Sequence, residues 1–284
     1  MAPLLEINNL RVEFRSRGLF RPHKPFVAVN DVSVSIEAGQ TLGLVGESGS
    51  GKTTLARSVL RLTRAASGSI RFDGHEVTEF GRVPLWYQRR VQAIFQDPTA
   101  SLNPSWSVQD IIAEPLRVHT DLSGAERAAR VSTLMEQVGL DPGLDHQRPA
   151  AFSGGQRQRI GIARALATEP DLIVCDEPVS ALDVSTQSTI VNLLNDVQRE
   201  TGVAYLFIGH DLGLMRHVSD RLAVMYHGKL VEEGPAETIY TDPQQDYTRR
   251  LLDAAPGFDP AEQQRKRDAR TTRAASQVLE ESTV

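Results

Sequence analysis

A glycine-rich segment at residues 46–53 has the residue types that bind phosphate groups. It reads GESGSGKT and matches the P-loop pattern, with an apolar run before it and a helix-forming stretch after it. Glycines let backbone N–H groups converge on phosphate oxygens, and the following helix N-terminus adds about half a positive charge. We expect Lys52 to reach the β- and γ-phosphates of a nucleoside triphosphate, and the Thr53 hydroxyl to ligate Mg²⁺. The predicted nucleotide-binding residues of this segment are Gly46, Glu47, Ser48, Gly49, Ser50, Gly51, Lys52, Thr53 and Thr54.

Two adjacent carboxylates, Asp176 and Glu177, directly follow the apolar run LIVC. Such a run is typical of a buried strand, and α/β sheets place ligand-binding groups just beyond the ends of their strands. We expect Asp176 to hold Mg²⁺ through its water shell. Glu177 is then predicted to orient and polarise the water that attacks the terminal phosphate.

A second candidate anion site lies at residues 153–156, which read SGGQ. Ser153 followed three residues later by Gln156 is a capping box and predicts the start of a helix. Free N–H groups, the flexible Gly154 and Gly155, and the Ser153 hydroxyl can together bind an anion. The chain therefore has two candidate anion sites, although a single γ-phosphate needs only one.

The segment FSGGQRQRIGIARAL, which begins at Phe152, resembles the signature motif of ABC transporter ATPases. The resemblance extends over nearly the whole chain, to about Pro256. It implies an α/β fold: a P-loop NTPase (RecA-like) core, an antiparallel β subdomain, and a helical insertion at about 98–160. It also implies that the cofactors are ATP and Mg²⁺, and that residues 153–156 bind the ATP held by a second protomer.

Other motifs of the family occur in the expected order. The resemblance assigns Gln96, in IFQDP, to the hinge that senses Mg²⁺ and faces the membrane partner. It places Asp183, in SALD, against the other protomer, and His210, in FIGHDL, near the γ-phosphate as a second catalytic residue. It assigns stacking on adenine to Phe14, for which Phe26 is an alternative.

Within the family, the chain is similar to the ATPases of oligopeptide and dipeptide importers. The similarity lies in GLVGESGSGKTTLAR, in IFQDPTASLNP and in a C-terminal extension at about 232–257. One departure leaves the substrate open, since Gln245 and Asp246 stand where these relatives have His-Pro before Tyr-Thr. The resemblance implies an ATP-hydrolysing subunit that powers uptake of oligopeptides, dipeptides or similar small nutrients.

Such a subunit implies several partners: two membrane permease subunits, a second ATPase protomer that is identical or paralogous, and indirectly an extracytoplasmic substrate-binding protein. We expect it at the cytoplasmic face of the cell membrane, as a peripheral protein. The segment at 97–112 is predicted to meet the permease, with Trp106 either anchoring that interface or packing locally. The alternative function is a soluble ABC ATPase that is not coupled to transport, although such proteins tend to have coiled-coil insertions or two fused cassettes.

Composition agrees with this assignment. The net charge of −5 argues against a nucleic-acid-binding protein. The single cysteine, Cys175, is interpreted as a small buried hydrophobe. The longest apolar stretches, such as residues 204–208, are far shorter than the roughly 20 residues of a membrane-spanning helix. We therefore expect contact with a membrane only through a partner.

Apolar runs at 41–45, 171–175 and 204–208 predict strands that are buried on both faces of a parallel sheet. Because helical stretches alternate with these runs, we expect one α/β domain over residues 1–257. The segment at 258–284 is polar and is predicted to be a mobile tail.

Overall fold

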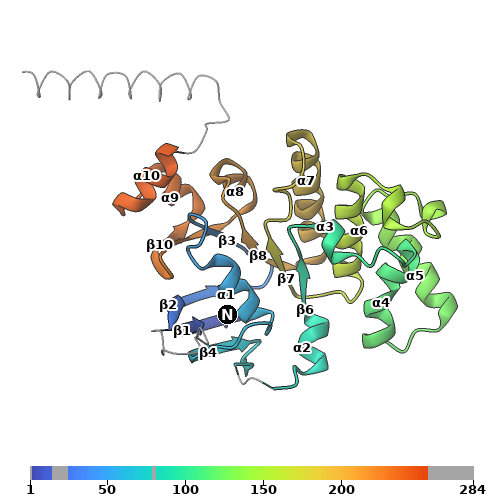
Figure 1. Cartoon of the computed structure of the whole chain (residues 1–284), viewed down its shortest axis with the longest axis horizontal. Helices are drawn as coiled ribbons and strands as arrows, with labels where there is room; N and C mark the ends of the chain where they lie inside the picture. The colour runs from blue at the N-terminus through green and yellow to red at the C-terminus, as the bar shows by residue number, and fades with distance from the viewer. Residues whose placement is uncertain (1, 15–24, 79–80, 255–284) are drawn as a thin grey trace, which may run out of the picture.

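The computed structural model describes residues 2–14, 25–78 and 81–254. The predicted tail at 258–284 and the last three residues of the predicted domain lie outside this part of the chain. Two sheets and a group of helices make up the described fold (Figure 1), which is the α/β arrangement that the sequence predicts.

A six-stranded sheet forms the centre of the molecule, with the strand order β10-β9-β3-β8-β7-β6. Its strands are β3 (Thr41–Val45), β6 (Val91–Ile94), β7 (Leu172–Asp176), β8 (Ala204–Ile208), β9 (Arg221–Tyr226) and β10 (Lys229–Pro235). All neighbours are parallel except β9 and β10, which form an antiparallel edge pair. Every residue of β3 and β8 is buried, so the prediction of strands covered on both faces is confirmed.

A four-stranded antiparallel sheet packs beside the central sheet, with the order β2-β1-β4-β5. It consists of β1 (Leu5–Phe14), β2 (Phe26–Ile36), β4 (Ser67–Phe72) and β5 (His75–Glu76). The turn that joins β4 and β5 is at Asp73 and Gly74, both at positive φ. This sheet is the antiparallel subdomain that the resemblance implies.

Helices fill the remainder of the described chain. The helices outside the insertion are α1 (Lys52–Val59), α2 (Leu85–Arg90), α7 (Val184–Thr201), α8 (Leu212–Val218), α9 (Ala236–Thr241) and α10 (Asp246–Ala254). The insertion comprises α3 (Pro98–Ser101), α4 (Val108–His119), α5 (Gly124–Gln137), the 3₁₀ turns η1 (Pro142–Leu144) and η2 (Pro149–Ala151), and the start of α6 (Gly154–Leu166). Figure 1 shows α4, α5 and α6 together at one end of the molecule. The segment after Gln96 begins with the short helix α3, because the Asp97 carboxylate caps it by accepting two N–H groups.

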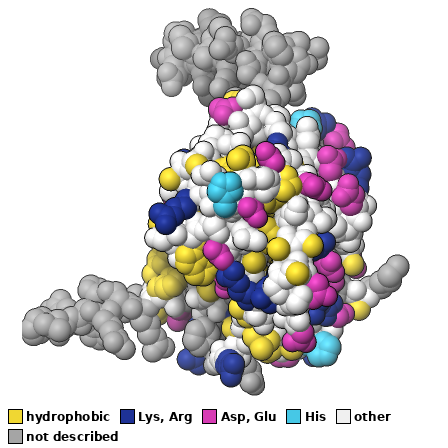
Figure 2. Space-filling model, turned by 90° about the vertical axis from the view of Figure 1, so that its right-hand side faces the viewer, with side chains coloured by type: hydrophobic (Ala, Val, Ile, Leu, Met, Phe, Trp, Pro, Cys, Tyr) yellow, Lys and Arg dark blue, Asp and Glu magenta, His cyan; other side chains and the backbone are white. Residues whose placement is uncertain are grey.

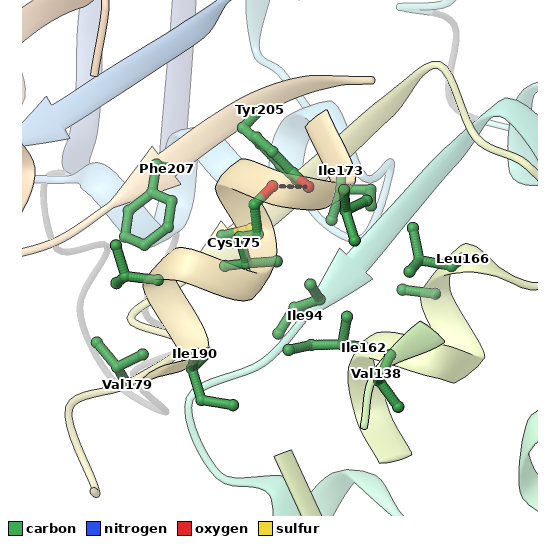
Figure 3. Close-up of a cluster of buried hydrophobic side chains, with 14 of the residues drawn as sticks. Ile94, Val138, Ile162, Leu166, Ile173, Cys175, Val179, Ile190, Tyr205 and Phe207 are labelled. Carbon is green, nitrogen blue, oxygen red and sulfur yellow. Dashed lines mark hydrogen bonds between the residues drawn. The ribbon is translucent and has the colours of Figure 1, made fainter. Parts of the chain in front are cut away.

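The helical insertion packs on the central sheet through an apolar cluster that surrounds Cys175 (Figure 3). Ile94, Ile162 and Phe207 belong to this cluster and are at most 2% exposed. The Tyr205 hydroxyl is satisfied within the cluster, since it donates to the carbonyl of a residue in α7 at 3.1 Å. Cys175 is fully buried, as predicted for a small hydrophobe, and this burial raises the pKa of its thiol.

The face that carries the helical insertion is shown in Figure 2, where acidic and basic side chains are intermixed. Among the described residues, no helix combines the length and the apolar character that crossing a membrane requires.

Candidate functional site

The predicted site residues meet at one edge of the central sheet because four parallel strands end there. The strand register pairs Leu44 of β3 with Ile208 of β8, Ile208 with Asp176 of β7, and Cys175 of β7 with Ile94 of β6. The segments that follow these strands carry Gly46, Gln96, Glu177 and His210. Side chains that are far apart in the sequence therefore lie beside one another, as is usual at the carboxyl edge of an α/β sheet.

Residues 46–53, hereafter the P-loop, wrap around the start of α1. Gly51 precedes this helix at φ 106°, and a Cβ atom there would lie 2.3 Å from the Ala28 carbonyl oxygen of β2. Lys52 is 5% exposed, and its Nζ donates to the carbonyls of Gly46 at 2.7 Å and Glu47 at 2.9 Å. Burial lowers the pKa of Lys52. The ammonium is thus enclosed by the loop and turned away from bulk water.

Thr53 and Asp176 form a candidate Mg²⁺ site. The Thr53 hydroxyl donates to the Asp176 carboxylate at 3.2 Å. Burial, followed by the nearby charge of Glu177, raises the pKa of Asp176, although the Thr53 hydrogen bond opposes the shift. Mg²⁺ prefers oxygen ligands and commonly takes one or two protein oxygens together with waters and phosphates. The Thr53 hydroxyl and the Asp176 carboxylate supply protein oxygens of this kind and number.

Glu177 is the centre of a second group of side chains. Its backbone has φ 49°, a left-handed conformation that costs an ordinary residue roughly 1–3 kcal/mol. The Gln96 side-chain amide donates to Glu177 Oε2 at 3.1 Å, and His210 Nδ1 lies 3.4 Å from the same oxygen. The Glu177 side chain is 22% exposed and that of His210 is 61% exposed. The structure therefore brings together Glu177, which is predicted to polarise the attacking water, His210, which is predicted near the γ-phosphate, and Gln96, which is predicted to sense Mg²⁺.

The second anion site, at residues 153–156, lies apart from the P-loop. Figure 1 shows α1, which begins in the P-loop, and α6, which begins at this site, on opposite sides of β7. The predicted capping box is present, because Ser153 and Gln156 each bond the other's backbone N–H. A Cβ atom on Gly155 would lie 2.6 Å from Thr186 of α7, so only glycine fits the close approach of that helix.

Asp183 lies at the start of the same helix, α7. Its carboxylate accepts hydrogen bonds from the Thr186 N–H at 3.0 Å and the Ser185 hydroxyl at 2.6 Å. Hydrogen bonds from Ser185 and Thr186 hold the pKa of Asp183 well below its usual range. Within the described residues, the Asp183 carboxylate bonds the first turn of α7, and Thr186 of that turn is also the residue that approaches Gly155.

The two candidates for adenine stacking lie opposite each other. Phe14 pairs with Phe26 at the end of the β1–β2 ladder, and the side chains are 48% and 65% exposed. The close contact between Gly51 and Ala28 places the beginning of β2 beside the P-loop. Both aromatic rings are therefore near the nucleotide site, and the assignment of stacking to Phe14 stays a prediction.

Two contacts to the P-loop could not be inferred from the motifs. The Glu47 N–H donates to the Tyr247 hydroxyl of α10 at 3.1 Å, and the Gly228 N–H donates to the Ser50 carbonyl at 2.9 Å. Both partners come from the far end of the chain, and no residue spacing links them to the P-loop.

A groove of about 690 Å³ adjoins the site. It lies between the end of β6, α3 and the C-terminal part of α4, and Gln96 and Asp176 are among its lining residues. The exposed apolar side chains of Phe95 and Val118 also line it. Trp106 is 40% exposed but lies outside this lining, so it is not an anchor within the groove.

Comparison with known proteins gives consistent results. The sequence pattern of the ABC transporter family matches residues 29–180. The chain is 50% identical to the oligopeptide transport ATP-binding protein OppF of Bacillus subtilis (strain 168) over 260 residues, which are 90% of this chain and 84% of that protein. It is 49% identical to the glutathione import ATP-binding protein GsiA of Escherichia coli (strain K12) over 268 residues, which are 93% of this chain but only 43% of GsiA.

A solved structure has the same fold. It is a dimeric ATP-binding cassette in a post-hydrolysis state, bound to ADP and Pi, and it superposes with a TM-score of 0.73 at 25% identity. The match covers 82% of this chain and 98% of that one.

Proposed function

The chain belongs to the ABC transporter family and is an ATP-hydrolysing subunit of that type; on this premise we propose that it powers an importer of oligopeptides, dipeptides or similar small nutrients. The observation that carries the proposal is the 50% identity to OppF over 90% of the chain. GsiA, whose name records the import of glutathione, itself a tripeptide, supports the same class of cargo. The role is peripheral, at the cytoplasmic face of the membrane.

The geometry supports hydrolysis at the carboxyl edge of the sheet. In the proposed site, the P-loop N–H groups and Lys52 hold the phosphates, and Glu177 orients and polarises the attacking water. Gln96 donates to one oxygen of the Glu177 carboxylate, and His210 lies beside the same oxygen. Thr53 and Asp176 would hold Mg²⁺, which supplies neutralisation of the phosphate charge.

The second protomer completes each ATP site in this proposal. Figure 1 shows α6, which begins at residues 153–156, on the opposite side of β7 from α1, and the dimeric relative shows that a cassette of this fold can pair. We therefore assign Ser153 and Gly155 to the ATP that a partner's P-loop holds. The partner is either a second copy or a paralogue.

Mixing two inactive variants tests this shared site. Ser153→Ala and Lys52→Ala should each lose ATPase activity, whereas their mixture should recover about a quarter of wild-type activity if copies of this chain pair at random. Half of the pairs are then mixed, and each mixed pair has one site that is intact on both faces. Turnover is measured after subunit exchange has been verified by energy transfer between labelled chains. No recovery despite exchange would show that the site is built within one chain.

We assign the groove beside Gln96 to the membrane permease. It opens onto the ATP site through Gln96 and Asp176, while Phe95, Val118 and Ala100 offer apolar surface to a partner. A partner seated there would sense any movement of Gln96. ATP binding and permease conformation are then coupled reciprocally.

Substitutions in the groove are expected to separate transport from ATP turnover. Ala100→Arg and Val118→Glu should reduce transport at least about tenfold, because a charge is buried against the partner, and leave basal ATPase activity within about twofold. Leu144→Glu is the matched control, since Leu144 is 37% exposed and lies near the opposite end of α4. Both activities are measured in reconstituted vesicles. Equal loss of transport and basal ATP turnover would show that the groove serves the ATP site and does not bind the permease.

Affinity purification from membranes tests the proposed function as a whole. We expect two permease subunits to copurify with the chain, and stimulation of its ATPase activity by the peptide-loaded binding protein. The competing function, an ABC ATPase not coupled to transport, predicts that no permease copurifies and that peptide has no effect.

A further inference from the structure

The C-terminal helix α10 reaches the nucleotide-binding loop. Its second residue, Tyr247, accepts the N–H of Glu47 on its hydroxyl at 3.1 Å, across 200 positions of the sequence. Glu47 is the second residue of the P-loop, directly after β3. Tyr247 is 8% exposed, and its hydrogen bond to the loop is partly buried.

Tyr247 is held in place by contacts outside the P-loop. Its ring centroid lies 4.2 Å from that of Tyr226, at the end of β9. The start of α10 is tied to β10, because the two carboxylate oxygens of Glu232 accept the N–H groups of Gln244 at 2.7 Å and Gln245 at 3.2 Å. The phenol is therefore attached to the sheet by a ring contact and by the hydrogen bonds of the two residues that precede its own helix.

The P-loop is supported at a second point by the same part of the chain. The turn between β9 and β10 contains Gly228, whose N–H donates to the Ser50 carbonyl. Tyr226, which precedes this turn, is the residue that packs against Tyr247. The turn and α10 thus form one support that bonds the loop at Ser50 and at Glu47.

We propose that Tyr247 is a positioning residue for ATP binding, which holds the P-loop backbone at Glu47 so that the following N–H groups are preorganised for phosphate. The proposal rests on the assignment of the P-loop as the ATP site. It gives the C-terminal extension a role in nucleotide affinity, because docking of α10 and binding of ATP favour the same loop conformation. Tyr247 acts through the backbone and touches no reacting atom.

Removing the hydroxyl alone should weaken nucleotide binding. Tyr247→Phe keeps the ring that packs on Tyr226 and deletes only the acceptor for the Glu47 N–H. A hydrogen bond of this kind corresponds to about a three- to tenfold change in an equilibrium constant. Because the loop binds the phosphates in the ground state and the transition state alike, KM for ATP should rise by that factor while kcat stays constant.

Tyr240→Phe is the matched control. Tyr240 lies in the neighbouring helix α9, is partly buried, and donates its hydroxyl to the Leu212 carbonyl, so its removal deletes a hydrogen bond without touching the P-loop. KM and kcat are measured on the full chain, together with the melting temperature. Amide hydrogen exchange of the peptide that covers the P-loop provides a local readout, and this exchange should accelerate in Tyr247→Phe only.

An unchanged KM in Tyr247→Phe would overturn the proposal, as would a rise of the same size in Tyr240→Phe. A loss of kcat in proportion to a lower melting temperature would also overturn it, since Tyr247 would then serve stability alone. The parallel variant Lys52→Ala separates this failure from failure of the ATP site. If Lys52→Ala binds ATP normally, the P-loop assignment is wrong. If Lys52→Ala loses affinity for ATP while Tyr247→Phe keeps it, the P-loop assignment stands and Tyr247 has no positioning role.

Discussion

Replacing Glu177 with Gln is expected to lower ATP turnover about 10²–10⁴-fold while leaving ATP binding intact. The amide keeps the size of the side chain and can still meet Gln96 and His210, but it cannot accept a proton from water. The position of Glu177 at the end of β7, with Gln96 at 3.1 Å and His210 at 3.4 Å from one carboxylate oxygen, motivates the expectation. Single-turnover hydrolysis and calorimetric ATP binding measure the two quantities separately.

A control carboxylate distinguishes a local effect from a general one. Glu136→Gln changes an exposed glutamate on α5 and should leave turnover within about twofold, as expected for a surface substitution. Near-normal hydrolysis by Glu177→Gln would remove Glu177 from the catalytic role. Loss of ATP binding in that variant would instead indicate that Glu177 shapes the site.

Replacing Lys52 with Ala is expected to weaken ATP affinity by about ten- to a hundredfold, and hydrolysis at least as much. Charge-assisted hydrogen bonds contribute about 1.5–3 kcal/mol, which corresponds to this range. Lys52 is the only lysine of the P-loop, and its ammonium is enclosed by the carbonyls of Gly46 and Glu47. Isothermal titration with ATP and Mg²⁺ provides the affinity.

Stability has to be followed in the same variant, because Lys52 is buried and bonds the loop. We expect the melting temperature to change little, since removal of the ammonium also removes the burial penalty that lowers the pKa of Lys52. Lys229→Ala, at an exposed position of β10, is the control and should bind ATP as the wild type does. Unchanged affinity and turnover in Lys52→Ala would contradict the P-loop assignment.

Several parts of the fold could be predicted because their signals are local. The runs at 41–45 and 204–208 are β3 and β8, since continuous apolar residues specify strands that are covered on both faces. The capping box at Ser153 could be predicted from two residues three positions apart, because the hydrogen bonds involved span that distance. The family motifs also allowed Gln96 and His210 to be assigned to the site, because they occur before and after Glu177 in the order that the family has.

Other features depend on the packing of distant segments. Trp106 was predicted either to anchor the permease interface or to pack locally, and the structure leaves it outside the lining of the groove. The groove itself is a space between β6, α3 and α4, and no single segment encodes its shape. Strand pairing places Phe26 opposite Phe14, so the assignment of adenine stacking to Phe14 stays a prediction with Phe26 as its alternative.

The sequence alone identified the family and predicted phosphate-binding chemistry at residues 46–53 and the roles of Asp176 and Glu177. Each prediction rests on contiguous residues whose local geometry is set by backbone dihedrals and caps. Only the tertiary structure decided which of these groups meet. Parallel strand register aligns the ends of β3, β6, β7 and β8 and so brings Gln96 and His210 to Glu177. The hydrogen bond from Glu47 to Tyr247 depends on where α10 docks, and a contact across 200 residues leaves no spacing in the sequence from which it could be predicted.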